Sequence, residues 1–249
     1  MYADDNTPTI SHSDPCILLE QTQSLANDIV NWFVQNDMVV SGDKTKFLIL
    51  GTRANRRLKI EENLDFHSEV LVDQQSVPAV HSEKLLGVIV NDYLNWKAHL
   101  DGNNEHCGLL SDLSRRIGVL KHLRNYLPSS KLKQVVSGIF TSKLIYCMSV
   151  WTGIWGLGGQ QEDVTRSTIS KEDMRRLQVL QNKAMRLITK CDRWTPTSTL
   201  LGKTSFLSVH QLGAYHTALQ VFKTHLTRKL HITMRDSLEE TGAGKICFR

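Results

Sequence analysis

The sequence lacks the long apolar runs and the basic N-terminus that mark membrane and secreted proteins. No stretch approaches the roughly 18 uninterrupted apolar residues that a membrane-spanning helix needs. The first basic residue is Lys44, and Asp4, Asp5 and Asp14 precede it, which is the reverse of the charged start of a signal peptide. We therefore expect an intracellular protein, cytoplasmic or nuclear, with no membrane partner.

Cysteine is sparse and irregularly spaced. The chain has 5 cysteines and 10 histidines, with no Cys-x-x-Cys pair and no cysteine at metal-ligand spacing from a histidine. This pattern gives neither a zinc motif nor a disulfide framework. We expect reduced thiols at all five positions, which are Cys16, Cys107, Cys147, Cys191 and Cys247.

The formal net charge of +5 hides an uneven distribution. Residues 1–43 contain seven acidic residues and no Lys or Arg. Residues 170–230 contain eleven basic residues against Glu172, Asp173 and Asp192. This asymmetry is typical of a protein that holds cations at one end and a polyanion along the other. Solvated helix faces explain the same pattern equally well.

The hydrophobic pattern predicts an α+β region first. Apolar residues at three- and four-residue steps predict a helix from Asp14 to about Asn36. Continuous apolar runs predict buried strands over residues 44–51 and 84–90. Gly87 lies inside the second run, where a bulge or a close backbone approach is expected. Shorter strands are predicted at residues 58–60, 69–72 and 76–80.

From Trp96 onward the hydrophobic period is helical. Apolar stripes predict helices at residues 110–120, 132–144, 174–188 and 209–226. Gly, Gln, Thr and Ser are frequent between residues 153 and 170 and indicate a linker. The expected organisation is an α+β unit (residues 1–92), a helical region (93–152), the linker (153–170) and a second helical region (171–249).

Tyr2-Ala3-Asp4-Asp5 is the motif that carries chemistry. Adjacent carboxylates in a tight turn between strands can hold divalent ions. Nucleotidyl transfer uses two such ions, about 4 Å apart, to activate a 3′-hydroxyl and stabilise the leaving pyrophosphate. Magnesium takes few protein carboxylates, so an Asp pair and one further Asp suffice. In isolation, an exposed acidic terminus explains Asp4 and Asp5 equally simply.

Further segments follow this motif along the chain. They include Lys44-Thr45-Lys46-Phe47, Leu85-Leu86-Gly87-Val88, Leu94–His99, Leu144–Trp151, Leu180–Ile188 and Thr195-Pro196-Thr197. In order and spacing, the whole series resembles the reverse transcriptases of non-LTR retrotransposons of the jockey and RTE types. Two positions depart from the family pattern, since Ser41 stands where Asn is usual and Leu85 replaces an aromatic residue.

The resemblance implies a partial polymerase palm followed by an all-helical thumb or connection region. The palm part would comprise the Tyr-x-Asp-Asp turn, a helix and short antiparallel strands. The implied activity is RNA-directed DNA polymerisation, with an RNA template and a DNA primer as partners. Asp4 would be the ligand of Mg²⁺ or Mn²⁺ and Asp5 its supporting carboxylate, while Tyr2 would line the hairpin near the primer or substrate.

The resemblance also implies roles outside the metal motif. Lys44 would lie near the incoming triphosphate, where a cation offsets developing charge, although a surface lysine at a strand start is an equal alternative. Leu86 and Gly87 would position the primer end, with a core strand as the alternative. Trp96 and His99 share a helical face and are better explained by packing between palm and thumb than by catalysis.

Lys183, Arg186 and Lys190 share one face of a predicted helix, where they either track a phosphate backbone or form a solvated surface. The family's fingers and its earlier Asp-bearing strand have no counterpart in these residues, so the metal site is expected to be incomplete. We therefore expect no polymerase activity from these residues alone. The alternatives are a nucleic-acid-binding remnant without catalysis and a decayed fragment without function.

Overall fold

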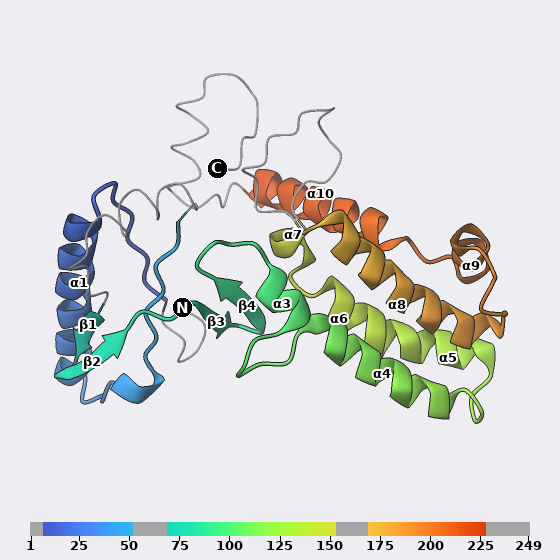
Figure 1. Cartoon of the computed structure of the whole chain (residues 1–249), viewed down its shortest axis with the longest axis horizontal. Coiled ribbons are helices and arrows are strands. Elements are labelled where there is room, and N and C mark those ends of the chain that lie inside the picture. The colour runs from blue at the N-terminus through green and yellow to red at the C-terminus, as the bar shows by residue number, and fades with distance from the viewer. Residues whose placement is uncertain (1–6, 52–68, 153–168, 228–249) are drawn as a thin grey trace, which may run out of the picture. The chain divides into compact units, whose positions relative to one another are not determined.

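The chain forms two compact units, Met1–His106 and Cys107–Arg249. The computed structural model describes residues 7–51, 69–152 and 169–227 (Figure 1). The first unit combines a long helix with two small antiparallel strand pairs, and the described part of the second unit is helical. The predicted mixture of helices and short antiparallel strands is confirmed.

The first unit begins with α1 (Pro15–Gln35), close to the predicted bounds. The Asp14 carboxylate accepts a hydrogen bond from the Cys16 N–H at 2.8 Å and caps the helix. Pro15 occupies the first turn, where its missing N–H costs nothing. The helix ends at Gln35, and the N–H of Asn36 donates back to the carbonyl of Phe33.

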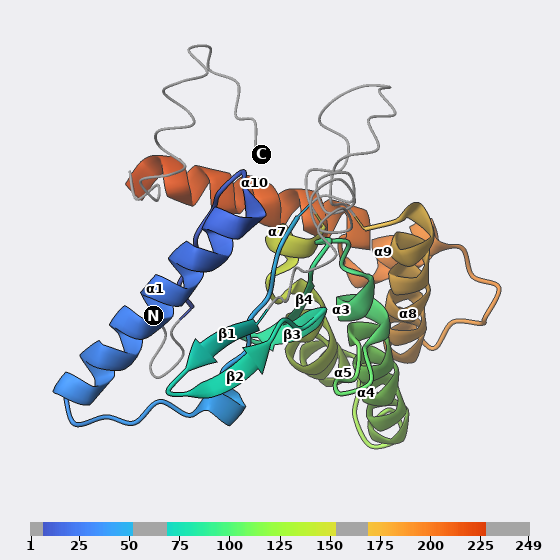
Figure 2. The same cartoon turned by 60° about the vertical axis from the view of Figure 1, so that its left-hand side comes forward.

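A hairpin of β1 (Glu69–Val72) and β2 (Gln75–Pro78) lies against α1 (Figure 2). The Gln23 side chain joins the two, because its amide donates to the Leu71 carbonyl at 2.9 Å and accepts from the Leu71 N–H at 2.8 Å. The strands predicted at residues 69–72 and 76–80 are confirmed, the second with a shift of one to two residues. The small core consists of Val70, Val72 and Val77, with Ala26, Val30, Val40 and Phe47 packed on it.

The predicted single strand over residues 84–90 is wrong. This segment is a hairpin in which β3 (Ser82–Leu85) pairs with β4 (Val88–Asn91). Leu86 and Gly87 form its two-residue turn, with φ of 47° and 86°. Two successive positive φ values are the signature of a type I′ turn, whose twist matches that of the flanking strands. Gly87 therefore marks a chain reversal, not a bulge within one strand.

The predicted buried strand over residues 44–51 is also wrong. Lys44 ends a short 3₁₀ helix, Gly42–Lys44, and the segment after it bridges to the rest of the unit at isolated points. The Phe47 carbonyl accepts from the Val80 N–H at 2.8 Å, and the Gly51 N–H donates to the Asp92 carbonyl at 3.0 Å. In place of a ladder, the described part of this segment forms one isolated bridge, between Phe47 and Ala79. The strand predicted at residues 58–60 lies outside the described residues.

The described helices of the second unit are α4 (Leu109–Leu123), α5 (Ser129–Val136), α6 (Ser142–Ile145), α7 (Met148–Trp151), α8 (Lys171–Thr189), α9 (Thr197–Thr204) and α10 (Val209–Thr227). The four helices predicted for the second unit are confirmed, the one at residues 132–144 as α5 and α6 with a π-helical turn between them, whereas α7 and α9 were not predicted. α8 lies along α4 and α5, with α9 at its C-terminal end and α10 beside α7 (Figure 1). The short α3 (Lys97–Asp101) belongs to the first unit, where it packs on β4.

A line of fully buried side chains at four-residue spacing forms the centre of the second unit. Its members are Leu132, Val136, Phe140, Leu144 and Met148. In an α-helix, four residues turn through about 400°, so side chains spaced by four residues shift by about 40° around the helix axis at each step. A π-helical turn at Ser137–Thr141 interrupts the helix here and counteracts this shift, because it holds an extra residue. The Arg116 guanidinium donates to the Ile139 carbonyl within this turn at 2.8 Å.

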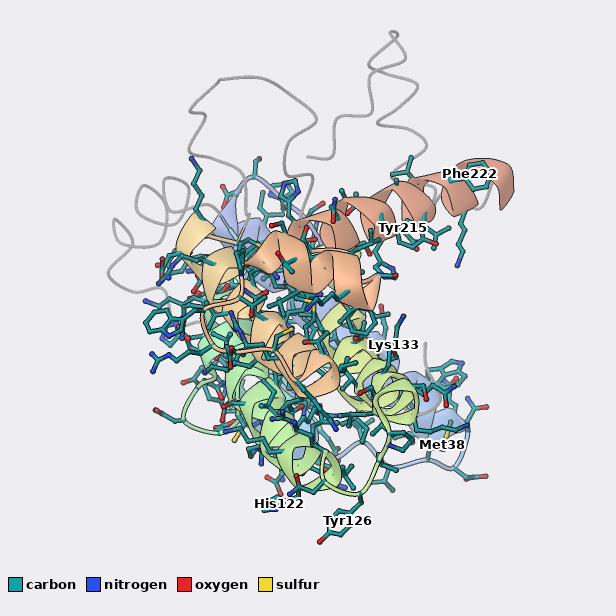
Figure 3. The ribbon with its side chains drawn as sticks, turned by 90° about the vertical axis from the view of Figure 1, so that its right-hand side faces the viewer. Met38, His122, Tyr126, Lys133, Tyr215 and Phe222 are labelled. Atoms are coloured by element: carbon teal, nitrogen blue, oxygen red, sulfur yellow. The ribbon has the colours of Figure 1, made fainter. Side chains whose placement is uncertain are left out.

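α10 is helical as predicted, but its predicted apolar stripe is only partly buried. Val209 is buried, whereas Tyr215 and Phe222 are 54% and 58% exposed (Figure 3). The orientation of α10 about its own axis follows from Gly213, which lies close to Thr152. A Cβ at Gly213 would lie 3.2 Å from the Thr152 hydroxyl oxygen. This close contact turns Gly213 inward and the two aromatic rings outward.

Candidate functional site

Tyr2, Asp4 and Asp5, the predicted metal motif, lie outside the described residues. Their roles therefore stay predictions, based on the chemistry of two adjacent carboxylates, whose oxygens are the donors that Mg²⁺ prefers. Within residues 7–51, 69–152 and 169–227, no group of three or more His, Cys, Asp or Glu side chains is placed to hold a metal ion.

Lys44 is an exposed residue at the end of the 3₁₀ helix. Its N–H donates to the Ser41 carbonyl at 3.3 Å, and the Thr45 hydroxyl donates to the same carbonyl at 2.8 Å. The backbone around Lys44 is thus fixed while its ammonium group faces solvent. This placement leaves both predicted roles open, a contact to phosphate and a surface lysine.

Leu86 and Gly87 form the tip of the β3–β4 hairpin. Leu86 is 45% exposed and has a left-handed backbone, which is rare for a branched apolar residue and costs on the order of 1 kcal/mol or more. The alternative prediction for Leu86, a residue of a core strand, is wrong. The predicted role of Leu86 and Gly87 at the primer end stays a prediction.

Trp96 and His99 lie where α3 packs on β4 of this hairpin. Both are buried, and His99 Nδ1 accepts a hydrogen bond from the Ile89 N–H at 3.3 Å. Trp96 precedes α3 with a φ of 57°. Both residues are buried where α3 contacts β4 within the first unit, so a packing role is shown, whereas packing between palm and thumb stays a prediction.

A buried Asp92 beside His81 was not predicted. The Asp92 carboxylate lies 3.0 Å from His81 Nδ1, and the Asp92 N–H donates to the His81 carbonyl at 3.0 Å. A buried carboxylate needs such partners. The two residues flank the last strand pair, so their contacts close the open end of the β3–β4 hairpin. No motif indicated this pair, because its two residues are eleven positions apart in the chain.

Lys183, Arg186 and Lys190 do not form a single free basic face. Lys183 is exposed on α8, and Lys190 is the left-handed residue that ends this helix, with a φ of 55°. Arg186 is bound to the backbone of the next connection, because its guanidinium donates to the carbonyls of Asp192 and Thr195 at 3.2 and 3.1 Å. Phosphate contacts by the two lysines stay a prediction, whereas Arg186 has structural partners.

Other polar residues of the α8 motif also hold the chain that follows. Gln181 and Asn182 are buried. Gln181 Nε2 donates to the Leu207 carbonyl at 2.8 Å, and Asn182 Nδ2 donates to the Thr197 hydroxyl at 2.9 Å. The Leu180–Ile188 segment therefore supplies both core residues and hydrogen bonds that fix α9 and the start of α10.

The connection between α8 and α9 presents an aromatic residue that the sequence analysis did not single out. The Thr195 N–H donates to the Asp192 carbonyl at 3.1 Å, which closes a turn with Arg193 and Trp194 at its tip. Trp194 is 81% exposed, and the Arg193 guanidinium carbon lies 4.7 Å from the centre of its ring. The polar sequence before Thr195-Pro196 was the available signal, since such clusters mark turns.

Of the four acidic residues that the structure describes in the second unit, three pair with basic neighbours. Asp112 lies within 4 Å of Arg115, Arg116 and Lys143, and Asp173 pairs with Arg176 at 2.9 Å. Hydrogen bonds from Arg175 hold the pKa of the Glu172 carboxyl below its ordinary value. The remaining lysines and arginines therefore give this unit a positive surface, which attracts polyanions.

Comparison of the chain with protein-family models, curated protein sequences and solved structures finds no match. Among the described residues, no helix is both long enough and apolar enough to cross a membrane. The described residues comprise a strained hairpin tip in the first unit and a cationic helical surface with an exposed Trp in the second.

Proposed function

We propose that the chain is part of the RNA-directed DNA polymerase of a non-LTR retrotransposon, spanning the end of the palm and the helical thumb region. The ordered series of segments from Tyr2-Ala3-Asp4-Asp5 to Thr195-Pro196-Thr197 carries this proposal. The exposed hairpin tip at Leu86-Gly87 supports it, because a primer-positioning element must reach the nucleic acid. The cationic surface of the second unit supports it as well.

In this proposal Asp4 and Asp5 would hold Mg²⁺ or Mn²⁺. The bound metal would lower the pKa of the attacking hydroxyl and stabilise the leaving pyrophosphate. Lys44 would contact the triphosphate, and Tyr2 would line the hairpin beside the primer or substrate. A further carboxylate is required to complete the two-metal site, and the 249 residues offer no motif for it.

Primer extension tests the polymerase proposal. The reading frame that contains these residues, including any upstream sequence encoding fingers and an Asp-bearing strand, should incorporate nucleotides on an RNA template with Mg²⁺. Asp4→Asn should abolish incorporation, and Asp14→Asn serves as a matched control because Asp14 caps α1. Residues 1–249 alone should show no incorporation. Template-dependent synthesis by residues 1–249, abolished by Asp4→Ala, would contradict the incomplete site.

A nucleic-acid-binding role without catalysis is the second candidate, and the cationic surface of the second unit favours it. It predicts RNA or DNA affinity that falls steeply with salt and persists in the Asp4→Ala variant. A decayed fragment would bind no nucleic acid and would not unfold cooperatively. Urea unfolding followed by circular dichroism separates this last possibility from the other two.

A further inference from the structure

One end of the helical unit carries two exposed aromatic rings. Trp194 lies at the tip of the α8–α9 turn with 81% exposure, and Tyr126 lies in the α4–α5 connection with 84% exposure. Both connections lie at the same end of the helical unit in Figures 1 and 2, and Tyr126 projects into solvent in Figure 3. Large rings exposed to this extent contribute nothing to the core of this unit.

The Trp194 ring is held in place although it is exposed. Arg186 fixes both ends of its turn through the carbonyls of Asp192 and Thr195, and Asn182 fixes Thr197 at the start of α9. The Arg193 guanidinium lies 4.7 Å from the ring centre, which is a cation–π distance. The turn therefore presents a preorganised aromatic surface with a positive charge on it.

The surroundings of the two rings are cationic. Among the described residues, no carboxylate lies within ion-pair distance of the bases at this end, and Asp192 is the one acidic residue in either connection. These bases are Lys121, Arg124, Lys131, Lys190 and Arg193. The ligand that fits them is a polyanion that also offers flat apolar faces.

We propose that Trp194 with Arg193, and Tyr126 with the neighbouring bases, form a stacking platform for single-stranded nucleic acid. The exposed faces of unpaired bases stack on aromatic rings, while lysines and arginines contact the phosphates. A duplex hides its base faces, so it would use only the cations. The inference rests on the proposed function, which supplies nucleic acid as the class of ligand. It adds that the bound nucleic acid is single-stranded, and it names the residues that contact it.

The test measures binding of an unstructured, fluorescein-labelled RNA of about 12 nucleotides, within the size range of single-strand sites, and of its perfect duplex. Trp194→Ala in residues 1–249 should weaken single-strand binding about tenfold, as expected for one lost base–aromatic contact. Trp194→Phe should retain most of the affinity, because it keeps a ring. Tyr126→Ala should weaken binding less, since no hydrogen bond or cation from the described residues holds its ring.

The matched control is Trp32→Ala, because Trp32 is 53% exposed but belongs to α1 in the first unit. It should leave RNA affinity unchanged. Thermal unfolding by circular dichroism should give the same midpoint for the wild type and Trp194→Ala. Duplex affinity should also be the same in both, while a higher salt concentration weakens binding of both ligands.

Three results would overturn the proposed platform. In the first, Trp194→Ala leaves single-strand binding unchanged, and in the second it weakens single-strand and duplex binding equally. In the third, the chain binds phosphatidylserine vesicles through Trp194 but does not bind RNA. The first two would leave the proposed polymerase intact, because RNA is still bound. Absence of any RNA binding by the wild-type chain would contradict both the platform and the proposed function.

Discussion

In the second unit, Leu113, Phe140 and Trp151 are at most 1% exposed and belong to one continuous helical core. In the first unit, no described side chain of α1 is buried, and the core against it consists of three valines. The strands that the structure describes there form two separate two-stranded sheets, an arrangement that depends on cover from other elements. The comparison indicates that the second unit has its own source of stability, whereas the first depends on small, local contacts.

The largest effect is expected from Phe140→Ala. Phe140 lies in the π-helical turn and is 1% exposed, so its truncation should cost about 3–5 kcal/mol of unfolding free energy. Urea unfolding followed by circular dichroism measures this loss. Phe222→Ala is the matched control, because it is the same change at a 58% exposed position and should cost less than about 0.5 kcal/mol. Equal costs would contradict the claim of a helical core centred on Phe140.

A smaller effect is expected from Arg186→Met. The change removes two hydrogen bonds to the carbonyls of Asp192 and Thr195 and should cost about 1–2 kcal/mol, since hydrogen bonds from charged groups exceed the usual contribution. Lys183→Met on the same helix should change stability by less than about 0.5 kcal/mol. If both variants lose RNA affinity without losing stability, Arg186 contacts phosphate as the sequence predicted, and its carbonyl partners are secondary.

The hairpin tip of the first unit offers a gain in stability. Asn-Gly is the preferred pair for a type I′ turn, so Leu86→Asn should relieve the left-handed strain at Leu86 and stabilise the first unit by about 1 kcal/mol. Gly87→Ala, at a φ of 86°, should destabilise it by a similar amount. Hydrogen exchange of the β3 and β4 amides measures both changes. Destabilisation by Leu86→Asn would mean that contacts of the leucine side chain hold the hairpin together.

The sequence predicted elements whose signals are local. The bounds of α1 follow from Asp14, Pro15 and a regular apolar period, and the buried line from Leu132 to Leu144 follows from its spacing. The β3–β4 hairpin was missed because an apolar run containing Leu-Gly looks the same as a buried strand until the two φ values are known. The pair Leu86-Gly87 is not a typical turn sequence, so it did not indicate the backbone conformation of a turn.

Features fixed by contacts between distant residues were not predictable. The outward rotation of Tyr215 depends on Gly213 meeting Thr152, sixty-one positions earlier in the chain. Arg186 was grouped with Lys183 and Lys190 because spacing shows which residues share a helical face, but not which carbonyls the next turn brings to them. The turn between α8 and α9 also exposes Trp194. Trp194 could therefore be proposed as a binding residue only from the structure of this turn.

The smallest effect contrasts two thiols, one in each unit. The pKa of the Cys191 thiol lies below its ordinary value, chiefly because of a hydrogen bond with Thr189. The Lys203 ammonium, 3.3 Å from the sulfur, also lowers this pKa, whereas burial raises it. Cys16 follows the acidic N-cap Asp14. Because a thiolate is the reactive form, alkylation of Cys191 by iodoacetamide should reach its half-maximal rate at a lower pH than that of an unperturbed thiol.

Lys203→Met should raise the pKa of Cys191 and slow its alkylation at neutral pH a few-fold, because the stabilising cation is lost. The Cys16 rate in the same sample should not change and provides the internal reference, with peptide mass spectrometry assigning each site. An unchanged Cys191 rate relative to Cys16 in Lys203→Met would show that Lys203 does not act on the sulfur, and that hydrogen bonds with Thr189 and Thr195 account for the lowered pKa.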